Sequence, residues 1–160
     1  MPKISPFLWF DNQAEEAARF YTRVFKNSRI HKTLRYGPGM PQPEGSAMTV
    51  DFELDGQAFT ALNGGPEFQF TEAISFVVHC DSQQEVDYFW EKLTEGGEEQ
   101  ECGWLKDRYG VVWQIVPDAL MTMLEDPDAA RAQRVTEAML QMKKLDLPLL
   151  QQAYAGSPSA

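Results

Sequence analysis

The stretch "ISPFLWFDNQAE", residues 4–15, decides the fold, because it returns in altered form as "ISFVVHCDSQQE" at residues 74–85. At a constant offset of 70 residues the two copies have five identical pairs, and apolar residues fill most of the positions between them. A repeat on this scale indicates a chain built from two copies of one supersecondary unit. The identical pairs are Ile4/Ile74, Ser5/Ser75, Asp11/Asp81, Gln13/Gln83 and Glu15/Glu85.

Each copy is followed by a predicted amphipathic helix. Asn12 with Glu15 and Ser82 with Glu85 have the spacing of a capping box, in which two side chains satisfy the free N–H groups of the first turn. Apolar residues then recur at helical spacing, which indicates one buried face for each helix. These residues are Ala14, Ala17, Ala18, Tyr21, Val24 and Phe25 in the first helix, and Val86, Phe89, Trp90 and Leu93 in the second, which Gly96 and Gly97 end.

Extended segments follow both helices, so the predicted order is strand, helix and two or three strands, stated twice. The segments are 28–36, 47–56 and 57–65 in the first half, and 98–107 and 110–117 in the second. Aligning Gly56 with Gly110 places Thr60 opposite Gln114 in the repeat. The Pro- and Gly-rich residues 36–47 are either a lid over a pocket or an unstructured connector.

Beyond residue 117 the repeat stops and helices are predicted. Asp126 as cap and Pro127 at the first helical position start a helix over residues 127–145, and a shorter one follows Pro148 and stops at Gly156. We therefore expect a first module over 1–66, a second over 67–117 and a helical extension over 118–160, within one structural unit. The apolar face of the extension should cover either a partner subunit or the outside of the sheet.

Composition excludes several classes of function. The net charge of −10 disfavours nucleic acids and anionic membrane surfaces as partners. No apolar run approaches the roughly 20 residues of a transmembrane helix, and the first residues lack the pattern of a secretory signal. Cys80 and Cys102 have no disulfide or zinc spacing. We expect a cytoplasmic protein.

The doubled unit resembles the vicinal oxygen chelate superfamily, which includes glyoxalases, bleomycin-resistance proteins and extradiol dioxygenases. The wording "PFLWFDNQAEEAARFYTRVF", "LNGGPEFQFTEAISFVVHC", "CGWLKDRYGVVWQIVP" and "DPDAARAQRVTEAMLQMKK" is similar to its PhnB-like branch, which carries the label 3-demethylubiquinone-9 3-methyltransferase-like. The resemblance implies an α+β fold of paired βαβββ modules whose strands form a curled mixed sheet, with C-terminal helices added, and a homodimer. It does not fix a reaction, and whether the protein is an enzyme stays open.

Metal-dependent members of the superfamily take ligands from equivalent positions of both modules. By the resemblance these positions fall at Ile4 or Ser5, at Ile74 or Ser75, at Thr60 and at Gln114, none of which is a strong ligand for Zn²⁺ or Fe²⁺. His79 shares a predicted strand face with Ser75, so a metal site, if present, would use His79 and Gln114. We expect no metal and no cofactor.

The leading hypothesis is a small-molecule-binding protein whose pocket has aromatic and amide surface. The candidate pocket residues are Trp9, Thr60, Asn63, His79, Trp104 and Gln114. Trp113, next to Gln114, is predicted to face the other way and to pack on a helix. The alternative is a metal-dependent lyase, isomerase or dioxygenase-type enzyme. A methyltransferase is a third possibility, but neither "GPG" (37–39) nor "NGG" (63–65) precedes a predicted helix in the way that a cofactor-binding turn requires.

Overall fold

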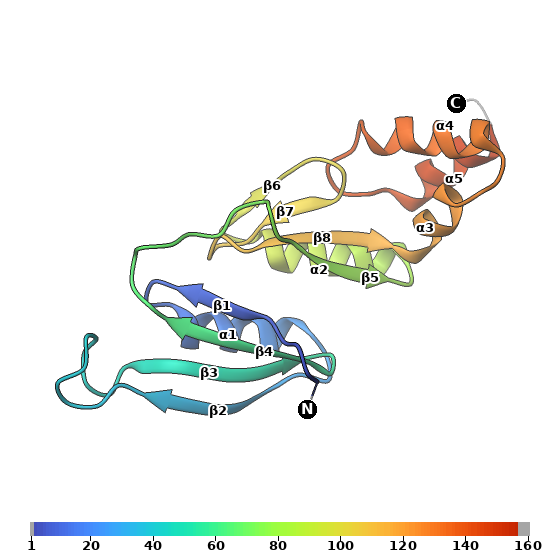
Figure 1. The fold of residues 1–160 in the computed structure, drawn as a ribbon. Helices are drawn as coiled ribbons and strands as arrows, with labels where there is room; N and C mark the ends of the chain where they lie inside the picture. Colours follow the sequence, from blue (N-terminus) through green and yellow to red (C-terminus); the bar gives the residue numbers. More distant parts are fainter. Residues whose placement is uncertain (1, 157–160) are drawn as a thin grey trace. The chain divides into compact units, whose positions relative to one another are not determined.

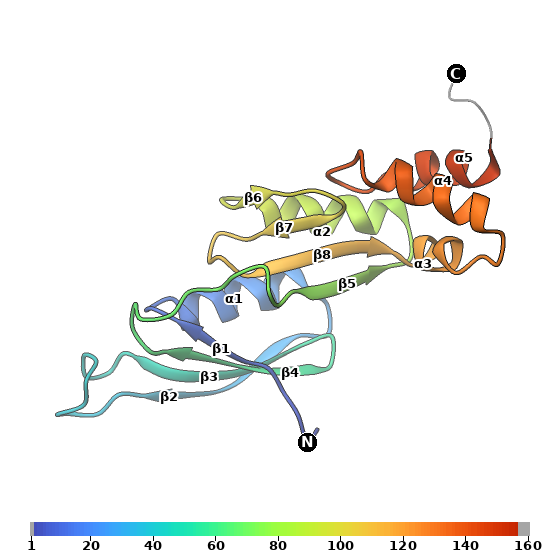
Figure 2. The ribbon, with the colours of Figure 1, turned by 45° about the horizontal axis from the view of Figure 1, so that its top comes forward.

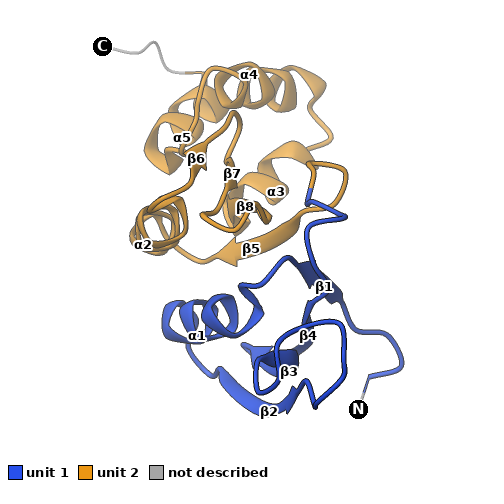
Figure 3. Ribbon diagram, turned by 90° about the vertical axis from the view of Figure 1, so that its left-hand side faces the viewer, with its two compact units in different colours: residues 1–70 blue, residues 71–160 orange. Residues whose placement is uncertain are grey.

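The computed structural model describes residues 2–156, and the chain divides into two compact units, residues 1–70 and 71–160 (Figure 3). Each unit contains a four-stranded mixed sheet that is not closed into a barrel, with a helix against it (Figure 1). The predicted α+β fold of two βαβββ modules with C-terminal helices is confirmed.

The first unit has the element order that the sequence predicts. Strand β1 (Phe7–Phe10) leads into helix α1 (Ala14–Val24), and three strands follow, β2 (Arg29–Arg35), β3 (Ala47–Leu54) and β4 (Gln57–Asn63). The sheet order is β1-β4-β3-β2, in which β1 and β4 are parallel and the other pairs antiparallel. Alternate residues of the strands are buried, including Phe10, Val50, Phe52 and Ala61, as are the apolar residues of α1.

The start of α1 differs from the prediction. The helix is capped at Gln13 without a side-chain hydrogen bond, so the capping box of Asn12 and Glu15 is wrong. Asn63 supplies the cap instead: its Oδ1 accepts from the backbone N–H of Ala14 at 2.8 Å, and its Nδ2 donates to the Ala47 carbonyl at 3.0 Å. Strand pairing explains this, because Asn63 lies opposite Phe10 at the end of β1 where the chain turns toward the helix.

The loop between β2 and β3 is held at its base. The backbone N–H of Tyr36 donates to Ser46 at 2.9 Å, and that of Gly45 donates to Tyr36 at 2.8 Å. The Tyr36 hydroxyl also donates to the Asn63 carbonyl at 2.6 Å. The hairpin therefore continues past the ends of both strands, and only its tip is left free of the ladder.

The second unit repeats the order, with shorter strands. It contains β5 (Phe76–Cys80), α2 (Gln83–Thr94), β6 (Glu98–Glu99), β7 (Trp104–Lys106) and β8 (Val112–Pro117), in sheet order β5-β8-β7-β6. The predicted cap of α2 is confirmed, since Ser82 Oγ accepts from the Glu85 N–H at 3.2 Å. Gly96, just past the helix, has a φ of +75° as predicted for its end.

Three helices make up the extension, α3 (Asp118–Leu124), α4 (Ala129–Met139) and α5 (Leu147–Ala155). Helix α3, which follows β8 without a break, was not predicted from the sequence. The helix predicted over residues 127–145 is too long: α4 is capped by Asp128 and not by Asp126, and Leu145 lies beyond its end. The helix after Asp146, with Pro148 near its start and Gly156 at its end, is confirmed.

The extension packs within the second unit, at one end of its sheet (Figure 2). Val116 of β8 joins the apolar cluster of the extension, whose buried members are Leu120, Met123, Val135, Leu145 and Leu150. The apolar face of the extension was expected to cover either a partner subunit or the sheet. The structure places these residues against the sheet of their own unit.

Polar contacts dock the extension as well. The consecutive N–H groups of Cys102 and Gly103 donate to the carbonyls of Met142 and Lys143 at 2.8 and 2.7 Å. The Gln83 side chain accepts from the Leu147 N–H at 2.6 Å and donates to the Leu145 carbonyl at 3.0 Å. No helix within residues 2–156 is long and apolar enough to cross a membrane.

Candidate functional site

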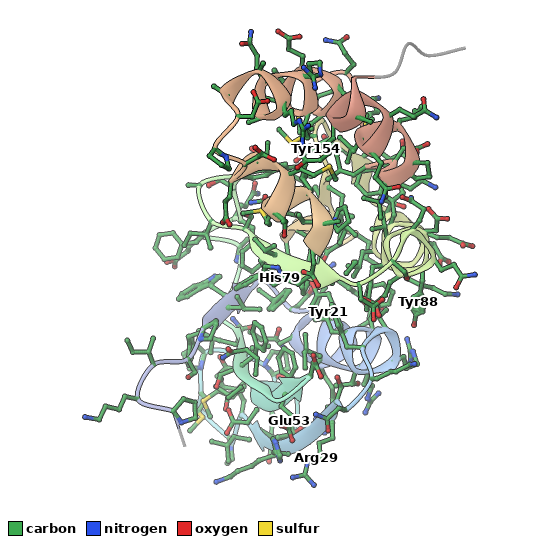
Figure 4. The ribbon with its side chains drawn as sticks, turned by 90° about the vertical axis from the view of Figure 1, so that its right-hand side faces the viewer. Tyr21, Arg29, Glu53, His79, Tyr88 and Tyr154 are labelled. Carbon is green, nitrogen blue, oxygen red and sulfur yellow. The ribbon has the colours of Figure 1, made fainter. Side chains whose placement is uncertain are left out.

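Three of the six predicted pocket residues lie on one face of the second sheet. Trp104 of β7 pairs with Gln114 of β8, and Gln114 pairs with Val77 of β5. His79, labelled in Figure 4, is two residues beyond Val77, so strand alternation places its side chain on the same face as that of Val77. We call the surface formed by Ser75, Val77, His79, Trp104 and Gln114 the Gln114 face.

Exposure varies along the Gln114 face. Along β8, Val112 and Val116 are 1% and 7% exposed, whereas Gln114 between them is half-buried. Val77 is 43% exposed beside it, which is high for a valine in a strand. This face therefore presents apolar, aromatic and polar atoms together between two covered positions.

Three polar contacts organise this face. Gln114 Nε2 donates to Ser75 Oγ at 2.9 Å, which fixes the amide. His79 Nδ1 lies 3.7 Å from Oδ1 of Asp118, the first residue of α3, and both side chains are largely exposed. At the other end, Lys106 Nζ contacts Glu72 at 2.8 Å, and this hydrogen bond lowers the pKa of Glu72 and raises the pKa of Lys106.

The first unit brings together two other predicted residues. Trp9 and Thr60 share the sheet face opposite the buried residues of β1 and β4. Trp9 is held in place: its Nε1 donates to the Gly65 carbonyl at 2.9 Å, and Phe68 contacts its ring edge-on at 4.9 Å. Thr60 Oγ1 donates to Asp51 at 2.8 Å.

Asn63 is placed differently from the other candidates. It is 7% exposed on the buried side of β4, and both amide atoms are used in the fold as described above. We leave it out of the site that we propose below.

Trp113 faces away from the Gln114 face, as alternation predicts. It is 3% exposed, and its Nε1 donates to Asp107 Oδ2 at 2.9 Å. Asp107 also accepts from the N–H groups of Tyr109 and Val111 through Oδ1. Trp113 of β8 therefore anchors the buried aspartate of the turn between β7 and β8.

Sequence reasoning missed Asp118 as a neighbour of His79. An aspartate directly after Pro117, at the end of a strand, is a helix-start signal that could have placed it. The signal is masked because the strand runs into the helix without a turn between them.

A metal site within one chain does not fit the residues present. In the part of the chain that the structure describes, no three His, Cys, Asp or Glu side chains gather in a way that could hold a metal ion. The His79–Asp118 pair and the His31–Glu53 pair, at 3.1 Å, each offer two ligands. The side chains at the two strand positions where related metalloenzymes have ligands, Thr60 and Gln114, already form hydrogen bonds with Asp51 and Ser75.

Comparison with known proteins places this geometry in a family. The model of the 3-demethylubiquinone-9 3-methyltransferase family matches residues 2–116. The chain belongs to this family. The PhnB protein from Bacillus cereus is 36% identical over 72% of this chain and 99% of its own, with a TM-score of 0.68.

More distant structures share the fold of this family member. PA1353 from Pseudomonas aeruginosa is 22% identical over 73% of this chain and 98% of its own, with a TM-score of 0.61. The fosfomycin resistance protein FosX from Listeria monocytogenes is 15% identical over 78% of this chain and 98% of its own, with a TM-score of 0.54. These two likenesses show a shared fold, and the predicted PhnB-like family is confirmed by the family match and by the Bacillus cereus protein. No curated protein matches.

The family name describes methyl transfer, but the glycines of this chain are not arranged as a cofactor turn. Residues 37–39 lie in the hairpin between β2 and β3, and residues 64–65 follow β4 without opening a helix. Within residues 2–156, none of the five helices starts directly after a glycine. The family match also stops at residue 116, so the extension lies outside it.

Proposed function

We propose that this family member binds a small, partly aromatic molecule on the Gln114 face. The observation that carries the proposal is that half-buried Trp104 pairs with Gln114, whose amide is fixed, and that the exposed imidazole of His79 lies on the same sheet face. Apolar surface with a few convergent polar groups is the usual form of a small-molecule site. Binding as such requires no metal in this proposal.

A thermal-shift screen against aromatic metabolites and antibiotics tests the proposal. A ligand at 100 times its dissociation constant stabilises a protein by about 2.7 kcal/mol. We expect Trp104→Phe and Gln114→Ala to reduce the shift. Gln57→Ala, at an exposed position of β4, is the matched control and should leave it unchanged. A ligand whose effect survives both substitutions on the Gln114 face binds elsewhere and contradicts the proposal.

The second candidate is a metal-dependent lyase, isomerase or dioxygenase-type enzyme. The His79–Asp118 pair favours it, because the pair supplies two of the three ligands that a zinc site needs. Gln114 and a group from another subunit would complete the set. Elemental analysis of protein purified without chelator, compared with a His79→Ala preparation, decides between the candidates: stoichiometric metal that disappears in the variant supports the enzyme.

We also propose that the protein is a cytoplasmic homodimer. Light scattering should then give twice the 18.2 kDa mass of one chain. The mass of a single chain at micromolar concentration would contradict the dimer.

A further inference from the structure

The partner of His79 comes from outside the segment that matches the family. The family model ends at residue 116, and Asp118 begins α3 just beyond it. His79 itself breaks the internal repeat, since Trp9 occupies the equivalent position of the first module. The extension therefore brings a carboxylate to the one imidazole on the Gln114 face.

The carboxylate determines which atom of the imidazole a ligand can use. His79 Nδ1 faces Asp118, so the favoured neutral tautomer carries its proton on Nδ1. Nε2 of that tautomer is a hydrogen-bond acceptor. At 3.7 Å the contact is longer than a hydrogen bond, and contacts of this kind commonly tighten when a ligand binds.

The face holds a second acceptor. Gln114 donates through Nε2 to Ser75 Oγ, which fixes the amide so that its Oε1 can accept a hydrogen bond from a ligand. The nearby cation, Lys106, is held by Glu72. A carboxylate or phosphate ligand would meet the negative charge of Asp118, whereas a neutral hydroxyl group would find acceptors.

We propose that His79, positioned by Asp118, accepts a hydrogen bond from the hydroxyl group of an aromatic alcohol whose ring lies against Trp104. The ligand class is thus a neutral phenol. This inference rests on the proposed function, whose site it shares, and it adds the donor that the ligand must carry.

The test compares ligands that differ in one group. Isothermal titration calorimetry of the full chain at pH 7 would use 2-naphthol, 2-methoxynaphthalene and 2-naphthoate. We expect 2-naphthol to bind about five-fold tighter than its methyl ether, the value of one neutral hydrogen bond in a partly exposed site. The carboxylate should bind most weakly.

Variants then show which residues distinguish 2-naphthol from its methyl ether. His79→Phe should bring the ratio of the two affinities close to one while leaving the methyl ether bound. Asp118→Asn should lower the ratio with no change in the affinity for the ether, which a purely structural role of Asp118 would not produce. His31→Phe is the matched control, because His31 is the other histidine and is exposed on β2 of the first unit.

Each outcome separates this inference from the proposed function. An unchanged ratio in His79→Phe overturns the inference, and loss of both ligands in Trp104→Phe would still support binding on the Gln114 face. If the wild-type chain binds none of the three compounds, the phenol class is wrong, and the wider screen decides on binding. If the ratio of the affinities for 2-naphthol and its methyl ether is unchanged in Asp118→Asn, Asp118 does not position His79 for the ligand.

Discussion

At the scale of single residues, strand alternation in the sequence predicts which way a side chain faces, but the sequence does not predict its hydrogen-bond partners. The parity of β8 correctly predicts that Trp113 turns away from Gln114. Asp107 is 3% exposed and accepts three hydrogen bonds, from Tyr109, Val111 and Trp113, which the sequence does not predict. Burial of a polar group depends on what the chain brings over it, which a local pattern does not contain.

Asp107→Asn should therefore destabilise the fold. The amide keeps the shape but replaces one acceptor oxygen with a donor, so at least one N–H loses its partner, at a cost of about 2 kcal/mol. Urea unfolding followed by fluorescence measures the change. Asp55→Asn, in an exposed turn where φ is +48° and Asn is well tolerated, should be neutral. Equal effects of the two substitutions would contradict the role of Asp107.

The two cysteines should differ in reactivity. Burial, with smaller contributions from the charges of Glu85, Asp118 and Asp81, raises the pKa of the Cys80 thiol to about 12. Because the thiolate is the reactive form, Cys80 stays unreactive at pH 8. Ellman's reagent should modify one thiol quickly in the native protein and two in denaturant. Cys102→Ser should remove the fast reaction; a fast reaction that persists in this variant would contradict the assignment.

At the scale of elements, the repeat predicts the order of strands and helices but not how each helix is capped. Asn12, which the sequence suggests as the cap of α1, is next to the helix in the chain. The residue that caps α1 is Asn63 of β4, which strand pairing with β1 brings to the start of the helix. For the same reason His79 can be singled out from the repeat, but Asp118 becomes its neighbour only because α3 follows β8 without a loop.

Asn63→Ala should cost about 2 kcal/mol of stability, because the helix loses its cap and the Ala47 carbonyl loses a buried donor. Asn12→Ala should change stability by less than about 0.5 kcal/mol, as for an ordinary surface position. Thermal and urea unfolding of the pair measure both values. A larger loss in Asn12→Ala would restore the capping box that the sequence suggests.

The docking of the extension can be tested at a glycine. A Cβ on Gly103, where φ is +83°, would lie 2.9 Å from Leu145 Cδ1 and 3.0 Å from the Ile115 carbonyl oxygen. Gly45 has a similar φ of +85° with nothing within 4 Å. Gly45→Ala should therefore cost about 1 kcal/mol for the backbone alone, and Gly103→Ala about 2 kcal/mol more for the clash. Equal costs would mean that the segment around Leu145 moves aside freely.

At the scale of the whole molecule, sequence reasoning recovers the doubled fold and the family but not the attachment of the extension. The apolar positions of residues 118–156 indicate buried helix faces, yet Leu145 is buried from a loop. That loop docks through backbone hydrogen bonds from Cys102 and Gly103 to the carbonyls of Met142 and Lys143. Backbone bonds carry no side-chain signal, so the sequence leaves open what the helices cover. The structure answers this for the second unit, where the extension both completes the apolar cluster at Val116 and supplies Asp118.

Acid should weaken this attachment. Lys144 Nζ lies 2.8 Å from Asp87 on α2, and the hydrogen bonds from Lys144 and Gln83 lower the pKa of Asp87 below its usual 3.8. A lowered pKa in the folded state contributes stability above the unfolded value, and the contribution is lost as the pH falls through the folded value. Because the pair is exposed, its contribution is only ~0.5 kcal/mol.

The pH dependence of one variant isolates that contribution. Asp87→Asn should lower the urea midpoint at pH 7, where the wild-type carboxylate is charged, and the difference from the wild type should shrink as the pH falls through the lowered pKa of Asp87. Asp55→Asn, which breaks no contact with the extension, should follow the wild type over the same pH range. A difference between Asp87→Asn and the wild type that persists undiminished in acid would mean that the aspartate acts through its shape and not through its charge. In that case Gln83, which bonds the same segment without a charge, would be the main polar anchor of the extension on α2.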